Sequence, residues 1–186
     1  TSYDGDIAAV AEFEHNVQIW NIRTVQRLSS FETTMDFGGT RLAINQSGTI
    51  CFAGAYERQG IAAYDAQTGE ELWRRKDLKK VQKLRASLDG GRLFCGFESR
   101  DFLILDESDG QSLEAISGAV DVWESPYESV VTVVQRGRDY SVRNLENVPF
   151  LTLSRTTFAA LDFAYGPQSL CISECTGAVT CFDVSS

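Results

Sequence analysis

The chain repeats an apolar segment that ends in Asp or Asn about every 40 residues, and this repeat limits what it can fold into. The terminal residues of the five segments are separated by 44, 41, 38 and 39 positions. A side-chain oxygen at a strand end accepts hydrogen bonds from the backbone of the following turn. We therefore expect equivalent strand ends at five positions: Asn21, Asp65, Asp106, Asn144 and Asp183.

Each interval of the repeat subdivides into four short segments separated by turn residues. The interval from 25 to 69, for example, contains segments at 26–31, 41–45, 50–56 and 61–65. Short strands with turns about every ten residues predict an all-β fold. Runs such as 102–105 and 130–134 are apolar at consecutive positions, which indicates strands covered on both faces. Radially packed blades provide that cover, so the sequence predicts a β-propeller of four-stranded antiparallel blades.

Three segments resemble known propeller repeats. Ile19-Trp20-Asn21 and Cys181-Phe182-Asp183 resemble the closing Trp-Asp position of WD repeats, and the stretch from Tyr64 to Trp73 is similar to the strand–turn–strand of quinoprotein-type repeats. The resemblance implies a propeller fold. The Gly-His pair of many WD repeats is absent, since His15 follows Glu14. The chain is also far shorter than the eight-bladed quinone enzymes, so no cofactor is predicted.

The predicted propeller is a single domain over residues 1–186. It has four complete blades, at 25–69, 70–110, 111–147 and 148–186, and an N-terminal half-blade at 6–24. A half-blade leaves an unpaired strand edge, which proteins normally cover. We expect the edge at 6–24 to be completed by missing chain of a larger ring, by a second copy or by another protein.

Charge and hydropathy exclude several partners and sites. A net charge of −9 argues against binding to a phosphate backbone, so no nucleic acid is predicted. No run approaches the roughly 20 apolar residues of a membrane helix, so no membrane is predicted either. Cys171 and Cys175 have a metal-like spacing, but His15 is the single histidine, and we predict no metal site.

Four cysteines lie within apolar strand segments: Cys51, Cys95, Cys171 and Cys181. We expect them to be unpaired and largely buried, because cysteine in such a setting behaves as a small hydrophobic residue. Free thiols are typical of a reducing compartment, and the predicted location is cytoplasmic.

All four lysines of the chain fall in one basic segment between residues 74 and 85. Two interpretations remain open for it. It is either a solvated loop whose long side chains cover apolar surface, or a contact for an acidic partner. The candidate partner-binding residues are Arg74, Arg75, Lys76, Lys79, Lys80 and Lys83. Acidic turn residues form either a matching rim or ordinary solvated turns: Asp89, Glu107, Asp109 and Glu128.

The sequence has few residues suited to catalysis. It has one histidine and no recognisable Ser-His-Asp or Cys-His motif. The three tryptophans are expected to pack between blades: Trp20, Trp73 and Trp123. We therefore predict a non-catalytic protein-binding or scaffolding propeller. Two alternatives stay open: a carbohydrate-active hydrolase with channel-facing carboxylates, and an inhibitor or immunity-type binder.

Overall fold

A computed structural model describes the chain at residues 2, 5–12, 15–35, 41–56, 59–124, 131–136, 139–144, 149–154, 160–165, 169–174 and 179–183. Within these residues every regular element is a β-strand, so the all-β prediction is confirmed. The strands form five antiparallel sheets, in the orders β1-β2-β3, β4-β5-β6-β7, β8-β9-β10-β11, β12-β13-β14-β15 and β16-β17-β18.

The bounds of the strands match the expected repeat closely. The first three sheets contain β1 (Ile7–Ala11), β2 (Asn16–Asn21), β3 (Gln26–Glu32), β4 (Arg41–Ile44), β5 (Ile50–Gly54), β6 (Ile61–Asp65), β7 (Glu71–Arg75), β8 (Val81–Ala86), β9 (Arg92–Phe97), β10 (Asp101–Asp106) and β11 (Ser112–Ser117). The last two sheets contain β12 (Ala119–Trp123), β13 (Val131–Arg136), β14 (Asp139–Asn144), β15 (Pro149–Ser154), β16 (Ala160–Tyr165), β17 (Ser169–Glu174) and β18 (Val179–Asp183).

The sheets are offset by one strand from the blade boundaries drawn on the sequence. The strands β3, β7, β11 and β15 were expected to open new blades, but each is hydrogen-bonded to the strand before it. The reason is the turn that follows each strand-ending Asp or Asn: its side chain accepts backbone hydrogen bonds from the turn, as Asn21, Asp65 and Asp106 do, and the turn folds the next strand back onto its predecessor. The first sheet therefore has three strands instead of two, and the last sheet has three instead of four.

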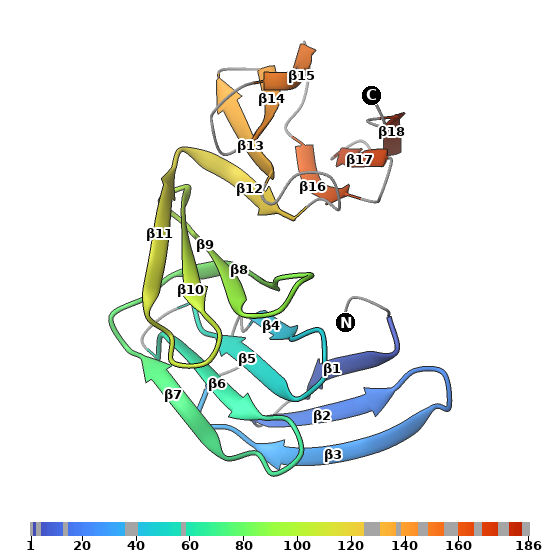
Figure 1. Ribbon diagram of the computed structural model, residues 1–186, viewed down its shortest axis with the longest axis vertical. Helices are drawn as coiled ribbons and strands as arrows, with labels where there is room; N and C mark the ends of the chain where they lie inside the picture. The colour runs from blue at the N-terminus through green and yellow to red at the C-terminus, as the bar shows by residue number, and fades with distance from the viewer. Residues whose placement is uncertain are drawn as a thin grey trace. The chain divides into compact units, whose positions relative to one another are not determined.

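The chain divides into two compact units, Thr1–Ile116 and Ser117–Ser186. In the first unit, β4 and β8 lie side by side on the inside, and β3, β7 and β11 lie on the outside (Figure 1). The strand β1 lies against β4 in the same way that β5 lies against β8. The three sheets of this unit thus repeat one arrangement.

The core of the first unit is two apolar layers, one on each face of the sheet β4–β7. Cys51, Ala53 and Ala62 pack in the layer shared with Val17 and Ile19 of the first sheet. The alternate residues on β5 and β6 pack in the layer shared with the third sheet, which contains Phe52, Ile61, Ala63, Leu93, Cys95 and Leu105. Because both faces are covered, β5 and β6 are apolar at nearly every position.

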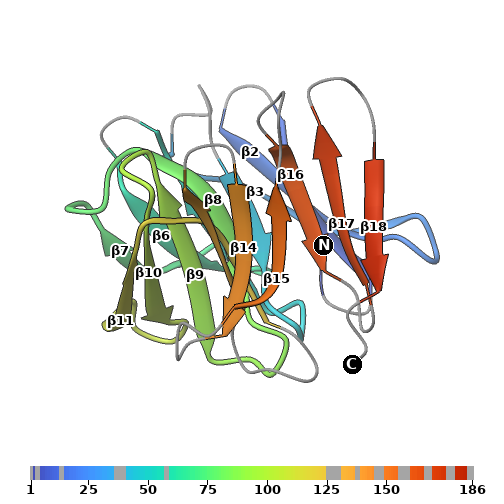
Figure 2. The same ribbon diagram turned by 90° about the horizontal axis from the view of Figure 1, so that it is seen from above.

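In the second unit, the sheet β12–β15 buries Val122, Val133 and Val142 completely. Figure 2 shows β16, β17 and β18 side by side as an antiparallel sheet. Cys171 of β17 is directly opposite Cys181 of β18, with 4.0 Å between their Cα atoms, and the two form a disulfide. The prediction of free, buried thiols is therefore wrong for this pair, since strand register brings the two sulfurs together. It is confirmed for the other two, Cys51 and Cys95.

The five residues of the repeat end the equivalent strands β2, β6, β10, β14 and β18, as predicted. The Oδ1 atom of Asp65 accepts hydrogen bonds from the backbone N–H groups of Gln67 (2.9 Å) and Thr68 (2.7 Å). Asp106 accepts one from Ser108 N in the same way (2.8 Å). These side chains tie each strand end to the turn that leads to the outer strand.

Candidate partner-binding surface

The basic segment starts on the outer strand β7, where Arg74 is turned into the protein. Its side chain is only 11% exposed and forms an ion pair with Glu71. Its guanidinium also donates to the hydroxyl of Tyr64 (2.9 Å) and to the sulfur of Met35 (3.0 Å). The hydrogen bond from Arg74 lowers the pKa of the Glu71 carboxyl. Arg74 therefore joins β7 to β6 and to the segment that follows β3.

Arg75 connects the second sheet to the third. Its Nη1 donates to the carbonyl of Gly110 (2.8 Å), in the turn between β10 and β11. Its Nη2 lies 2.7 Å from the Oδ2 of Asp77, and this hydrogen bond lowers the pKa of the Asp77 carboxyl. Arg74 and Arg75 thus have intramolecular partners that support the packing of sheets.

The remaining part of the segment is the connection from β7 to β8. We call residues 76–80 the lysine loop; its lysines Lys76, Lys79 and Lys80 are all exposed. Lys83 lies on β8 and is half-buried. Lys80 has a φ of 60°, so its backbone is in the left-handed region. A non-glycine residue keeps this conformation only where its surroundings hold it.

Hydrogen bonds to two neighbouring turns hold the lysine loop in place. The backbone N–H of Lys80 donates to the carbonyl of Tyr56 (2.8 Å), and its carbonyl accepts from the N–H of Glu98 (3.2 Å). The Nζ of Lys80 lies 2.6 Å from one carboxylate oxygen of Glu98, and the Tyr56 hydroxyl donates to the other, also at 2.6 Å. These contacts lower the pKa of Glu98 and fix the loop between the turns that follow β5 and β9.

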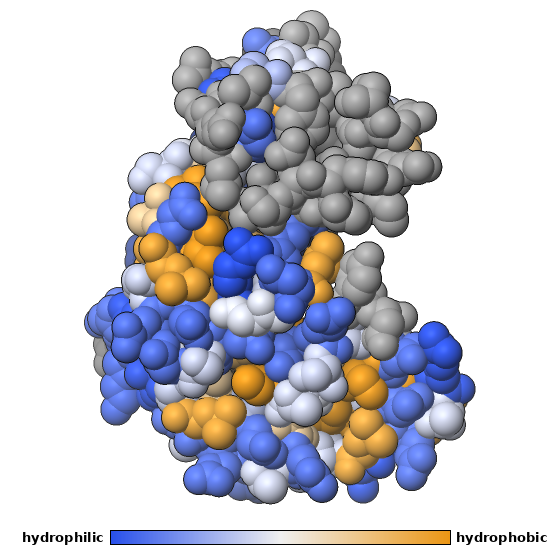
Figure 3. All heavy atoms as spheres, viewed as in Figure 1, coloured by the Kyte–Doolittle hydropathy of each residue, from blue (hydrophilic) through white to orange (hydrophobic). Residues whose placement is uncertain are grey.

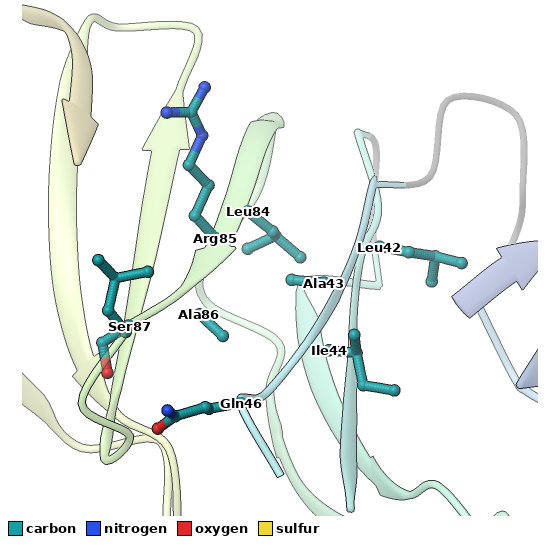
Figure 4. Close-up of a pocket in the computed structure, with 9 residues that line it drawn as sticks. Leu42, Ala43, Ile44, Gln46, Leu84, Arg85, Ala86 and Ser87 are labelled. Carbon is teal, nitrogen blue, oxygen red and sulfur yellow. The ribbon is translucent and has the colours of Figure 1, made fainter. Parts of the chain in front are cut away.

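A groove of about 240 Å³ lies between β4 and β8 (Figure 4). The side chain of Gln46 points from the turn after β4 toward β8 (Figure 4). The lining is mainly apolar and contains no carboxylate among the described residues: Leu42, Ala43, Ile44, Gln46, Leu84, Arg85, Ala86, Ser87 and Leu88. Glycoside hydrolysis requires a pair of carboxyl groups on either side of the bond to be cleaved. This groove has no such pair.

The described acidic turn residues of the first unit have partners within the protein. Asp89 lies 3.2 Å from a guanidinium nitrogen of Arg92, and Asp109 accepts a hydrogen bond from the backbone N–H of Gln111 (2.8 Å). The carbonyl of Glu107 accepts from the indole of Trp73 (2.8 Å). Glu128 lies outside the described residues.

The other residues considered for chemistry are placed in packing roles or are not described. His15 Nδ1 lies 2.5 Å from the carbonyl of Met35. Trp73 packs against Phe52, with 6.0 Å between ring centroids, and Trp20 is half-buried, while the side chain of Trp123 is not described. Across the described residues, no three side chains of the metal-binding types come together. No helix in the described structure could cross a membrane.

No protein-family model matches the chain, and no curated protein matches it. Solved structures do match. The structure of U3-55K is 14% identical, with a TM-score of 0.72 over 98% of this chain and 59% of that one. A chain in the crystal structure of the mitotic checkpoint complex is also 14% identical, with a TM-score of 0.72 over 99% of this chain and 59% of that one. Both are WD40 propeller proteins, so the fold is that of WD40-type propeller blades.

Proposed function

We propose that this chain is a non-catalytic binding module whose lysine loop contacts an acidic segment of a protein partner. One observation carries the proposal: Lys76 and Lys79 are exposed on a loop that the Tyr56–Lys80–Glu98 hydrogen bonds hold fixed. A preorganised loop loses little conformational entropy on binding. The rest of the chain is strongly acidic, with a net charge of −9 overall, so the loop is a local exception.

The fold supports a binding role. WD40-type propellers are typical scaffolds for protein binding, and one similar structure is a chain of a multiprotein assembly, the mitotic checkpoint complex. The chain spans 59% of the length of each of the two similar proteins. An acidic peptide or an acidic domain face fits the charge of the loop, whereas a hydrolase role has no paired carboxylates in the groove between β4 and β8.

On the face in Figure 3, hydrophilic side chains cover much of the first unit, with smaller apolar patches between them. This mixture is ordinary for a protein surface and does not by itself mark a binding site. We therefore attribute the proposed contact with the partner to the positive charge of the lysine loop. A cytoplasmic location remains part of the proposal: the free thiols of Cys51 and Cys95 support it, whereas the Cys171–Cys181 disulfide weighs against it.

A labelled peptide of ten glutamates tests the loop directly, with fluorescence anisotropy at low and physiological salt. Replacing Lys76 and Lys79 by Glu should weaken binding at least about tenfold, and the affinity of the wild type should fall with added salt because exposed charges are screened. The matched control is Arg23→Glu with Arg27→Glu, which changes the net charge equally at an exposed residue of the turn between β2 and β3 and at an exposed residue of β3. Arg23 pairs with Asp6, but its side chain is largely exposed, and such an ion pair contributes little to stability. Equal loss in both double variants would overturn the assignment to the loop.

Arg74 separates binding from stability within the basic segment. Arg74→Ala should lower the free energy of unfolding by about 2–3 kcal/mol, because it removes the ion pair with Glu71 and the charged hydrogen bond to the Tyr64 hydroxyl. Lys79→Ala should change it by less than about 0.5 kcal/mol. Urea denaturation measures both. Equal stability of the two variants would mean that Arg74 has no structural role.

A further inference from the structure

Two cations in neighbouring loops of the first unit have a left-handed backbone. Lys80 of the lysine loop has a φ of 60°, and Arg100, in the turn between β9 and β10, has a φ of 63°. Among the described residues, the other non-glycine residues of this kind are His15 and Val25. A Cβ strains the backbone in this region, and residues held there cluster at functional sites. The strain at Arg100 therefore needs either a compensating contact or a role for its side chain.

The corresponding turns of the first and second sheets accommodate the left-handed backbone in other ways. In the first sheet the equivalent residue is His15, and its Nδ1 lies 2.5 Å from the carbonyl of Met35. In the second sheet the turn has Gly60 in this conformation, with a φ of 75°, and glycine adopts it without strain. Arg100, by contrast, is exposed, and its guanidinium forms no hydrogen bond or ion pair with a described residue. Its side chain does not hold the turn together and is available to a partner.

Hydrogen bonds place the turn of Arg100 next to the lysine loop. The N–H of Glu98, in the same turn as Arg100, donates to the carbonyl of Lys80 (3.2 Å), and the Glu98 carboxylate pairs with the Lys80 ammonium (2.6 Å). The N–H of Arg100 donates to the carbonyl of Phe97 (3.1 Å), which closes the turn. Leu78 of the lysine loop packs against the apolar layer between the second and third sheets. The two loops are therefore held side by side before any partner binds.

The acids of these two loops leave a positive surface. Asp77 forms an ion pair with Arg75, and Glu98 forms one with Lys80, so a cation matches each of these carboxylates. Asp101 is half-buried at the start of β10. Three exposed cations of the two loops form no ion pair with a described residue: Lys76, Lys79 and Arg100. Positive charge therefore extends from the second sheet to the third.

We propose that Arg100 and the lysine loop form one binding surface, which receives an acidic peptide segment long enough to contact both loops. This inference rests on the proposed function and extends its site to the third sheet. The lysines attract the segment as point charges on flexible stems, whereas the guanidinium of Arg100 is a planar fork that matches the two oxygens of one carboxylate. Arg100 is therefore the residue that sets the position of the peptide on the surface.

Fluorescence anisotropy with the labelled ten-glutamate peptide, combined with urea denaturation, tests the proposal. Arg100→Gly should weaken binding about three- to fivefold, the upper part of the range for an exposed ion pair. Its urea midpoint should rise, because glycine removes the strain of the left-handed backbone. A residue that only supports the turn would not change affinity and stability in opposite directions. The matched control is Arg23→Gly, which removes an exposed arginine from the turn between β2 and β3 and should keep the affinity within about twofold.

The outcomes separate this inference from the proposed function. Weaker binding in Arg100→Gly and in the variant with Lys76→Glu and Lys79→Glu, with a higher urea midpoint for Arg100→Gly, would support a single surface. Weaker binding in the lysine variant alone would overturn the extension to Arg100 and leave the lysine-loop proposal in place. Weaker binding in Arg100→Gly alone would overturn the lysine-loop proposal and the single surface with it.

Two further results would also overturn the inference. If Arg100→Gly lowers both the affinity and the urea midpoint, Arg100 acts through the fold of its turn. If the wild-type protein does not bind the ten-glutamate peptide at all, the inference and the proposed function are both wrong.

Discussion

The strands β5 and β1 hold the same position in neighbouring sheets, yet one is core and the other is half-open. β5 reads ICFAG and is buried at all but its first position, with Phe52 at 0% exposure. β1 reads IAAVA, is just as apolar, and contains no fully buried residue. The difference lies in the neighbours, since β5 has a strand on each edge and a sheet on each face. The burial of β5 therefore comes from its neighbours and not from its composition alone.

Truncating the two strands should give the largest contrast. Phe52→Ala removes a ring that is buried between the second and third sheets, and it should lower the free energy of unfolding by about 3–5 kcal/mol. Val10→Ala should cost less than about 1 kcal/mol, since its side chain is already half in water. Urea denaturation of both variants checks this. A cost for Val10→Ala close to that of Phe52→Ala would show that β1 is covered after all.

The turns that lead to the outer strands give a second contrast. Gly69 has a φ of 77°, and a Cβ there would overlap the side chain of Phe31 on the preceding sheet. Val25 has a φ of 52° in the turn between β2 and β3 and is 78% exposed. Gly69→Ala should therefore destabilise by about 2–3 kcal/mol, through strain and overlap together.

Val25→Gly should act in the opposite direction, because valine in a left-handed conformation is strained and this side chain is largely exposed. We expect a gain of about 0.5–1 kcal/mol after the extra entropy of glycine in the unfolded chain. Thermal denaturation of Gly69→Ala and Val25→Gly measures whether each change lowers or raises the stability. Destabilisation by Val25→Gly would mean that the valine makes a packing contact that outweighs its strain.

The smallest effect concerns pH. The pKa of Asp65 is lowered by hydrogen bonds from the backbone and hydroxyl of Thr68, and that of Asp106 by bonds from Ser108. Because the folded pKa is below the unfolded value of about 4, the stabilisation is present above about pH 4 and is lost as the pH falls through the folded pKa. Asn21 holds the same position in the first sheet and does not titrate.

The double variant Asp65→Asn with Asp106→Asn should keep the turn acceptors and lose this titration. Its urea midpoint should fall less than that of the wild type between pH 5 and pH 2.5. Both proteins are measured in the same buffers at constant ionic strength. Identical pH profiles would show that the two carboxylates contribute nothing to acid sensitivity.

Local chemistry explains what could be predicted about the fold. Turn residues and strand-ending Asp or Asn act within a few positions of the chain, so the strands, their ends at Asp65 and Asp106, and the burial of Cys51 and Cys95 followed from the sequence. The same reasoning placed the blade boundaries one strand away from the boundaries of the sheets. The repeat length of about 40 residues is the same wherever the boundary is placed. Only the pairing of β2 with β3 across the turn at 22–25 assigns β3 to the first sheet.

The candidate site was predictable only as a stretch of charge. The seven basic residues between 74 and 85 look equivalent in the sequence. In the structure, Arg74 and Arg75 form hydrogen bonds within the protein, to Glu71, Asp77 and Gly110. Lys76 and Lys79, by contrast, are exposed. The acids Glu71 and Asp77 are near in sequence, but the contacts that join Arg74 to Met35 and Arg75 to Gly110 come from segments far along the chain, and the local sequence does not show them. The disulfide escaped prediction for a related reason: the register of β17 and β18 sets Cys171 opposite Cys181.

The sequence by itself determined that this protein is a repeat of short antiparallel strands, since strand alternation and turn chemistry depend on near neighbours. The tertiary structure alone decided which strands share a sheet, which cations reach solvent and which apolar strand has an edge that no described strand pairs with. Those properties depend on contacts between residues distant in sequence, such as Arg75 with Gly110 or β5 with β8. The strands β1 and β5 are similarly apolar in sequence, and the strands and sheets around β5 are what bury it.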